Sequence, residues 1–148
     1  MTYEKSTAMS PPILIADDDP AIRTLLKLIV QRTGLEVATA TNGEETLTMI
    51  EEGNYALVLL DLQMPLVNGF DVVERMRSKR PRPVILVLTA LPPAQTVLLD
   101  CEVVQAIIRK PFDVEFLADI LARMARSLLG GDEERLHFGL PDLGFATQ

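Results

Sequence analysis

The sequence predicts an α/β fold, in which a parallel sheet is covered by helices on both faces. Short, continuously apolar runs of strand length alternate with longer amphipathic runs of helix length over most of the 148 residues. The apolar runs have few polar interruptions, which is typical of parallel strands buried on both faces. Strands and helices that alternate in this way join through right-handed crossovers, so we expect three layers.

Five strands are expected. The runs that are apolar on both faces cover residues 13–16, 56–60, 84–88 and 103–108, with Gln105 inside the last of them. Residues 35–40 alternate apolar and polar side chains, which is typical of a strand at an edge of the sheet.

The first two connections carry clear helix signals. Residues 22–30 place Ile and Leu side chains at i, i+3, i+4 and i+7, and Gly34 is suited to the position just after the helix. Asn42 is suited to cap a second helix, which should end near Gly53.

The helix signals in the later connections differ in strength. The pattern predicts a helix from about Phe70 to Ser78, and another that starts near Asp113 and ends at Gly130-Gly131. Between them, Pro92–Glu102 predicts a short helix opened by two prolines within a mobile segment. Its apolar Val97, Leu98 and Leu99 fit either the core or an exposed contact patch.

The element order is therefore βα repeated five times, which predicts a three-layer, doubly wound (βα)5 fold with a five-stranded parallel sheet. In the flavodoxin-like strand order 2-1-3-4-5, ligands bind beyond the carboxyl ends of the first and third strands. Asp17 and Asp18 follow the first strand and Asp61 follows the third, so these carboxylates should meet there. Thr89 and Lys110 follow the fourth and fifth strands.

Three carboxylates in one crevice repel one another, by roughly 4 kcal/mol for each pair at about 4 Å and an effective dielectric near 20. Such a cluster raises a carboxyl pKa, holds a cation, or does both. Oxygen-only ligands favour a hard cation, Mg²⁺ or Mn²⁺. With the Lys110 ammonium and the Thr89 hydroxyl, the set suits phosphoryl transfer onto an aspartate.

Composition excludes several classes of protein. A net charge of −7 argues against direct binding of nucleic acid, and 48% hydrophobic residues argue against wholesale disorder. The lone Cys101 cannot form an internal disulfide, and no apolar run has the length of a membrane span. The first residues lack the apolar centre of a signal peptide, so we expect a cytoplasmic protein.

Three regions are expected along the chain. Residues 1–12 are polar, end in Ser-Pro-Pro and predict a disordered tail. Residues 13–129 form the domain. Residues 130–148 form a C-terminal tail or linker, which contains the only histidine, His137, and enough large apolar side chains to dock on the domain or on a partner.

Four motifs, ILIADDDP, LVLLDLQMPLVNGF, VILVLTA and IIRKPF, occur in this order. With them, residues 13–129 resemble the receiver domain of two-component response regulators. The resemblance implies that Asp61 is the phosphoacceptor. It also implies that Asp17, Asp18, Asp61 and the backbone carbonyl of Gln63 bind Mg²⁺.

The resemblance assigns the remaining site positions as well. It implies that Thr89 is a switch hydroxyl, that the small Ala90 leaves room for the phosphodonor, and that Lys110 stabilises the phosphoryl group. The Lys110–Pro111 peptide bond is expected to be cis. One position departs from the family: Ile107 stands where a Tyr or Phe ring usually turns inward when the threonine moves.

The implied function is a signalling switch rather than an enzyme with a separate substrate. A sensor histidine kinase or phosphotransfer protein would donate the phosphoryl group. A downstream protein or a second copy of the chain would respond to the surface of the fourth helix, fifth strand and fifth helix. Two alternatives stay open. A haloacid-dehalogenase-like phosphatase would use Asp17 and Asp19, and a binding module would signal without phosphorylation, which Ile107 favours.

Overall fold

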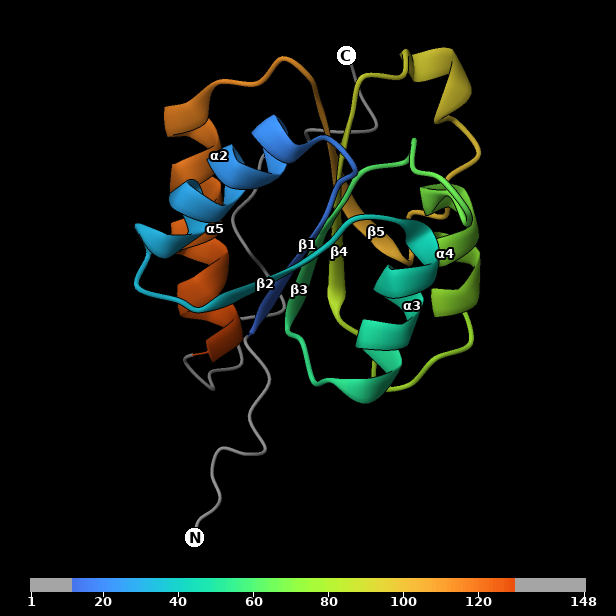
Figure 1. The fold of residues 1–148 in the computed structure, drawn as a ribbon, viewed down its shortest axis with the longest axis horizontal. Coiled ribbons are helices and arrows are strands. Elements are labelled where there is room, and N and C mark those ends of the chain that lie inside the picture. The colour runs from blue at the N-terminus through green and yellow to red at the C-terminus, as the bar shows by residue number, and fades with distance from the viewer. Residues whose placement is uncertain (1–11, 130–148) are drawn as a thin grey trace, which may run out of the picture.

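The computed structural model of the chain describes residues 12–129, and the predictions for both tails, for His137 and for the helix end at Gly130-Gly131 lie outside these residues. The elements are, in order, β1 (Ile13–Ala16), α2 (Pro20–Gln31), β2 (Val37–Ala40), α3 (Gly43–Glu52), β3 (Leu57–Leu60), α4 (Gly69–Met76), β4 (Val84–Thr89), the 3-10 helix η1 (Pro93–Gln95), β5 (Val104–Arg109) and α5 (Val114–Leu129). The strands form one parallel sheet in the order β2-β1-β3-β4-β5, which confirms the predicted fold class (Figure 1).

The burial of the strands follows their place in the sheet. Every residue of the central strands β1 and β3 is buried, whereas three of the four residues of β2 are only partly buried. β2 is therefore the wetter edge strand that its polar residues predict. β5 forms the opposite edge, and its Gln105 is exposed.

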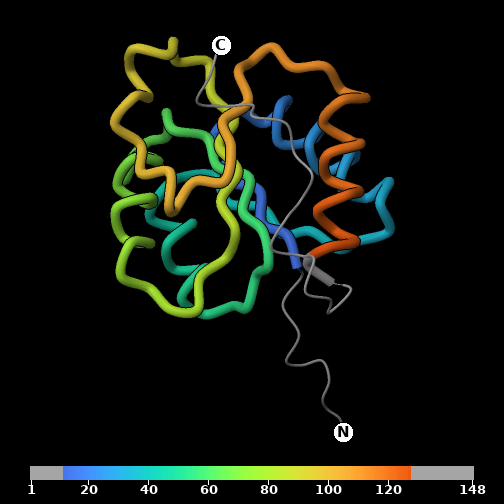
Figure 2. The backbone as a smooth tube through the Cα atoms, turned by 180° about the vertical axis from the view of Figure 1, so that it is seen from behind, coloured from blue at the N-terminus to red at the C-terminus, as the bar shows by residue number. Residues whose placement is uncertain are grey.

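The helices cover the sheet in two layers, with α2 and α5 on one face and α3 and α4 on the other (Figure 1). Seen from behind, the same two layers flank the sheet (Figure 2). The buried side chains that α2 and α5 contribute are Leu26, Ile29, Val30, Leu117, Ile120, Leu121 and Met124. Those that α3 and α4 contribute are Leu47, Ile50, Val72, Val73 and Met76.

Side-chain caps begin the helices α2, α3 and α4. Asp19 accepts hydrogen bonds from the N–H groups of the first turn of α2. Asn42 caps α3, as predicted, and Asn68 caps α4. None of the helices between residues 12 and 129 combines the length and apolar character that a membrane crossing requires.

The fourth connection corrects the prediction of a helix between β4 and β5. Only the three residues of η1 are helical there, and they form a 3-10 helix. The Thr96 hydroxyl donates to the carbonyl of Pro93, and the Asp100 carboxylate accepts from the N–H of Glu102. Side chains that bond to nearby backbone in this way compete with helix formation. In the apolar stretch of this segment Leu99 is buried, whereas Val97 and Leu98 are exposed.

Candidate functional site

The site begins where β1 and β3 end. Ala16 pairs with Leu60 in the sheet register, so the next residues, Asp17 and Asp61, lie side by side. The N–H of Asp61 donates to the carbonyl of Ala16 at 2.9 Å, which extends this pairing. Carboxylate oxygens of Asp17, Asp18 and Asp61 lie within 4.8 Å of one another, as the strand order predicts.

Lys110 brings a positive charge to these carboxylates. Its ammonium nitrogen lies 2.8 Å from Oδ2 of Asp17 and 3.8 Å from Oδ1 of Asp61. The side chains of Asp17 and Asp61 are 2% and 6% exposed, and that of Lys110 is 17% exposed. Because little solvent screens these charges, we expect the electrostatic attraction within each pair to be stronger than in a surface ion pair.

The backbone at Asp17 is held by Arg23, a residue of α2 that belongs to none of the four motifs. Arg23 donates from Nη1 to the carbonyl oxygen of Asp17 at 2.8 Å. The N–H of Asp19 donates to Oδ1 of Asp17 at 2.9 Å. The position of Asp17 is thus fixed from α2, and no motif spacing indicated that Arg23 would reach back over six residues.

Asp61 titrates above its usual range. The pKa of its carboxyl is raised from 3.8 to about 6: burial raises it most, and the neighbouring Asp17 and Asp18 also raise it. The Lys110 ammonium and the hydrogen bond from the N–H of Gln63 act in the opposite direction. Burial has the largest effect, so the net pKa is raised, as expected for a carboxylate in an anionic crevice.

The turn after β3 lets α4 approach Asp61 closely. A Cβ on Gly69 would lie 2.4 Å from the backbone oxygen of Asp61, so only glycine fits there. Leu66 in the same turn has a φ of 71°, a left-handed conformation that is an outlier for a bulky residue, and its side chain is 74% exposed. No sequence pattern indicated that Leu66 would adopt this conformation.

Thr89, at the end of β4, is fully buried. Its Oγ1 accepts a hydrogen bond from the N–H of Leu91 at 3.0 Å, and its O–H donates to no acceptor among residues 12–129. Ala90 is exposed beside it. Arg109, its register partner on β5, donates to the carbonyl of Leu91.

The other predicted site residues are placed as follows. The side chain of Gln63 is exposed, and its N–H donates to Oδ1 of Asp61 at 3.3 Å. The Lys110–Pro111 peptide bond is cis. Ile107 is 1% exposed and packs in the core beneath α3 and α4.

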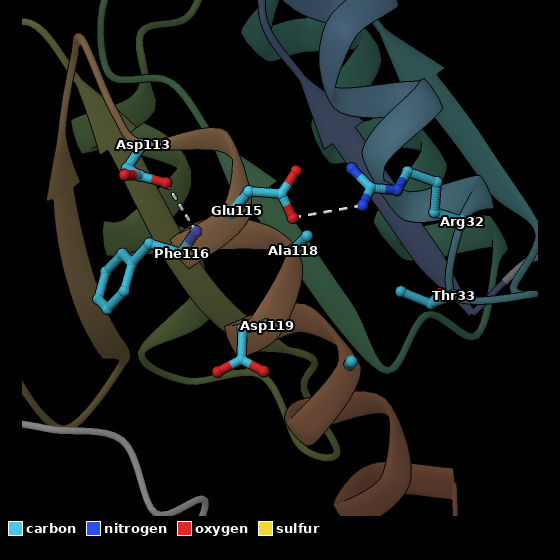
Figure 3. A pocket seen from close by; sticks show the side chains of 8 residues that line it. Arg32, Thr33, Asp113, Glu115, Phe116, Ala118 and Asp119 are labelled. Carbon is cyan, nitrogen blue, oxygen red and sulfur yellow. Dashed lines mark hydrogen bonds and ion pairs between the residues drawn. The ribbon is translucent and has the colours of Figure 1, made fainter.

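A cavity also lies away from these carboxylates. It has a volume of about 670 Å³ and lies between the end of α2 and the first half of α5 (Figure 3). Across it, Arg32 forms an ion pair with Glu115 at 3.4 Å, and Asp113 accepts a hydrogen bond from the N–H of Phe116. Both side chains of the ion pair are more than half exposed, so this hollow lacks the buried groups that reaction chemistry needs.

The donor set of the carboxylate pocket fits a hard divalent cation. Three carboxylates face one ammonium, so the pocket has an excess of negative charge. The exposed Asp18 takes no hydrogen bond or ion pair from residues 12–129. Oxygen ligands with surplus negative charge are those that Mg²⁺ prefers.

Comparison with known proteins shows a match to one protein family. Residues 13–122 match the response regulator receiver domain. The transcriptional regulatory protein SrrA of Staphylococcus aureus is 43% identical over 82 residues, which make up 55% of this chain and 34% of SrrA. The chain thus spans about a third of the length of these curated relatives.

Solved structures agree in fold. The response regulator TrrA of Thermotoga maritima, in complex with Mg²⁺-BeF, is 37% identical with a TM-score of 0.66, and the match covers 74% of this chain and 95% of TrrA. A CheY-like receiver domain protein of Methanospirillum hungatei is 26% identical with a TM-score of 0.72, and the match covers 81% of this chain and 97% of that one.

Proposed function

The chain belongs to the response regulator receiver domain family, and from that premise we propose that it takes a phosphoryl group onto Asp61 in a reaction that depends on Mg²⁺. The observation that carries this proposal is the pocket of Asp17, Asp18 and Asp61 with the ammonium of Lys110 beside it. The pocket combines a carboxylate nucleophile, an oxygen-rich cation site and a fixed positive charge.

Asp61 is the proposed nucleophile. Its Oδ1 is held by the N–H of Gln63 and lies near Lys110, whereas its Oδ2 takes no hydrogen bond from residues 12–129. In the proposed step, Oδ2 forms a bond to phosphorus while the phosphorus–nitrogen bond of a phosphohistidine breaks. The electron pair of the broken bond stays on the imidazole nitrogen, which takes a proton from solvent. The product is an acyl phosphate.

The pocket residues also have proposed roles in binding the cation and in stabilising the phosphoryl group. Asp17, Asp18, Asp61 and the backbone carbonyl of Gln63 would hold Mg²⁺, which when bound neutralises the charge on the phosphoryl oxygens. Lys110 supplies a second positive charge to the same oxygens.

Thr89 and Ala90 complete the proposed site. The buried Thr89 hydroxyl has a free donor for the phosphoryl group, and the small exposed side chain of Ala90 leaves the entrance open. Binding of this hydroxyl to the phosphoryl group would favour one of two arrangements of the loop after β4.

The proposed context is a cytoplasmic two-component pathway. A sensor histidine kinase or phosphotransfer protein is the donor, and the chain catalyses only its own phosphorylation and dephosphorylation. The surface formed by residues 91–103, β5 and α5 would present the signal to a downstream protein or a second copy. Because the chain covers a third of SrrA, activities of such whole regulators are not assigned to it.

The two alternatives are less well supported by the contacts. A phosphatase of the Asp-x-Asp type needs Asp19 in the pocket, but the carboxylate of Asp19 accepts from the N–H groups of Ala21 and Ile22 as the cap of α2. A binding module independent of phosphorylation gives no reason to keep a buried Asp61 with a pKa near 6, at a cost in stability.

The experiment is phosphoryl uptake from acetyl phosphate with Mg²⁺, followed by intact mass. Wild type should gain one phosphoryl group, and Asp61→Asn should gain none. Asp71→Asn, which changes an exposed aspartate of α4, is the control and should react like wild type. Equal uptake by Asp61→Asn contradicts the proposal. Turnover of a generic phosphate ester that is lost in Asp17→Asn but kept in Asp61→Asn favours the phosphatase instead.

A further inference from the structure

Position 107 lacks the Tyr or Phe ring that usually turns inward in the family when the threonine moves. Ile107 is aliphatic, 1% exposed and packed in the core, so it has neither a ring nor a polar group to exchange with Thr89. If Thr89 responds to a phosphoryl group, another side chain must transmit that response to residues 91–99.

Arg109 makes the contacts that such a role needs. Its Nη1 donates to the carbonyl of Leu91 at 3.0 Å, and its Nη2 donates to Oγ1 of Thr96 at 2.8 Å. Thr96 is buried, although it directly follows η1. One guanidinium thus holds both ends of the segment 91–96 against the edge of the sheet.

The same segment is tied to Thr89. The N–H of Leu91 donates to Oγ1 of Thr89 at 3.0 Å, while its carbonyl accepts from Arg109. Thr89 and Arg109 are also register partners on neighbouring strands. A continuous chain of hydrogen bonds therefore runs from Thr89 through Leu91 and Arg109 to Thr96.

The position of Arg109 lowers the stability of this arrangement. Nε of Arg109 is buried and has no hydrogen-bond partner among the described residues, and burial lowers the pKa of the guanidinium. An unsatisfied buried donor is destabilising. A second arrangement that satisfies or exposes Nε would therefore compete with this one, as a two-state element requires.

We propose that Arg109 is the positioning residue that couples Thr89 to residues 91–99, in the place of the aromatic residue that position 107 lacks. This inference rests on the proposed function of Asp61 and Thr89. When the Thr89 hydroxyl moves to the phosphoryl group, it gives up the N–H of Leu91. Leu91 then no longer holds its carbonyl against Arg109, and the guanidinium releases the segment.

The experiment compares amide chemical shifts and hydrogen exchange with and without Mg²⁺ and beryllofluoride, a phosphoryl mimic. In wild type, amides next to Asp61 and amides of residues 91–99 should both change, and exchange at Leu91 should accelerate roughly tenfold. In Arg109→Met, the amides next to Asp61 and the N–H of Leu91, which Thr89 itself holds, should respond as in wild type, whereas the response of residues 92–99 should fall below about a third. Phosphoryl uptake should stay within about twofold of wild type.

Three further variants sharpen the result. Arg109→Lys keeps the charge but has one donor point instead of a fork, so it should not restore the response. Thr96→Val removes one acceptor of the guanidinium and should weaken the response even if Arg109→Met does not fold. Arg32→Met changes an exposed arginine on the opposite helical layer and should behave as wild type.

The outcomes separate the two proposals. If wild type shows no change next to Asp61, the proposed function fails. If wild type changes next to Asp61 but not at residues 91–99, the coupling through Arg109 fails alone. The same conclusion holds if Arg109→Met, or Thr96→Val where the first variant does not fold, keeps the full response of residues 91–99.

Discussion

The ammonium of Lys110 lies 2.8 Å from a carboxylate oxygen of Asp17, although the two residues are 93 positions apart in the chain. The contact joins the ends of β1 and β5 across the carboxyl edge of the sheet. It leaves the same ammonium 3.8 Å from Asp61, so one cation serves two buried carboxylates. The charge balance of the pocket therefore depends on this lysine.

Replacement of Lys110 by Met should raise the pKa of Asp61 further above about 6, because the lysine is the opposite charge that lowers it. A ¹³C NMR titration of the aspartate carboxyls in the presence of a chelator measures this pKa. Phosphoryl uptake should fall at least about tenfold, since Lys110 faces the phosphoryl oxygens in the proposed step. Lys27→Met, at an exposed position of α2, is the matched control. An unchanged or lower pKa in Lys110→Met would show that the contact with Asp61 is not formed.

Asp61→Asn should stabilise the cation-free protein at neutral pH. The raised pKa of Asp61 means that the folded state binds its proton more tightly than the unfolded state does. Ionisation of Asp61 therefore lowers the free energy of unfolding of wild type as the pH rises from 3.8 to about 6, and this loss persists at higher pH. The full shift corresponds to roughly 3 kcal/mol. We expect the variant to exceed wild type by about 1–3 kcal/mol in free energy of unfolding at pH 7.5 and to show little difference at pH 4. Urea unfolding with a chelator measures both, and Glu36→Gln is an exposed control. If the difference in free energy of unfolding between Asp61→Asn and wild type is the same at pH 7.5 and at pH 4, the raised pKa of Asp61 is contradicted.

Divalent cation binding should weaken as the pH falls through about 6. Protonation of Asp61 removes one ligand and one negative charge, so the cation and the proton compete. Titration with Mn²⁺ followed by electron paramagnetic resonance, with Mg²⁺ as competitor, measures the affinity. Asp18→Asn should bind at least about tenfold more weakly while its stability without cation stays close to wild type, because Asp18 is exposed and takes no bond from residues 12–129. Wild-type affinity in Asp18→Asn would remove this residue from the site.

Gly69→Ala should destabilise the protein and disturb the pocket together. The added Cβ would lie 2.4 Å from the backbone oxygen of Asp61, so α4 or the end of β3 must shift. We expect a loss of about 2–4 kcal/mol in free energy of unfolding and slower phosphoryl uptake. Gly53→Ala is the control, because Gly53 has a φ of −109°, which any residue adopts. A Gly69→Ala protein as stable and reactive as wild type would contradict the close packing at this turn.

The sheet and the carboxylate pocket could be predicted because each depends on a local pattern. The apolar runs identify the strands, and once the strand order is known, Asp17 and Asp61 must meet because each follows its strand directly. The fourth connection could not be predicted, because its prolines and apolar residues fit a short helix. The side-chain bonds of Thr96 and Asp100 to nearby backbone decide against one, and sequence spacing does not reveal them.

The contacts of the two arginines illustrate the same limit. Arg23 lies on the polar side of an amphipathic pattern, yet it bonds to the carbonyl of Asp17. Arg109 precedes Lys110 within a recognised motif, but its partners Leu91 and Thr96 lie on a segment whose path depends on tertiary contacts. The motif therefore places Arg109 next to Lys110 in the chain, but sequence spacing does not reveal its partners Leu91 and Thr96.

The central claim is that Asp61 accepts the phosphoryl group in a pocket completed by a divalent cation. Borohydride reduction of the protein after incubation with acetyl phosphate and Mg²⁺ tests it most directly, because hydride converts an aspartyl phosphate to homoserine and releases phosphate. Peptide mass spectrometry then locates the converted residue. We expect homoserine at position 61 in samples with Mg²⁺, and none when a chelator replaces it. Conversion at another aspartate, or equal conversion at position 61 without a divalent cation, would contradict the account.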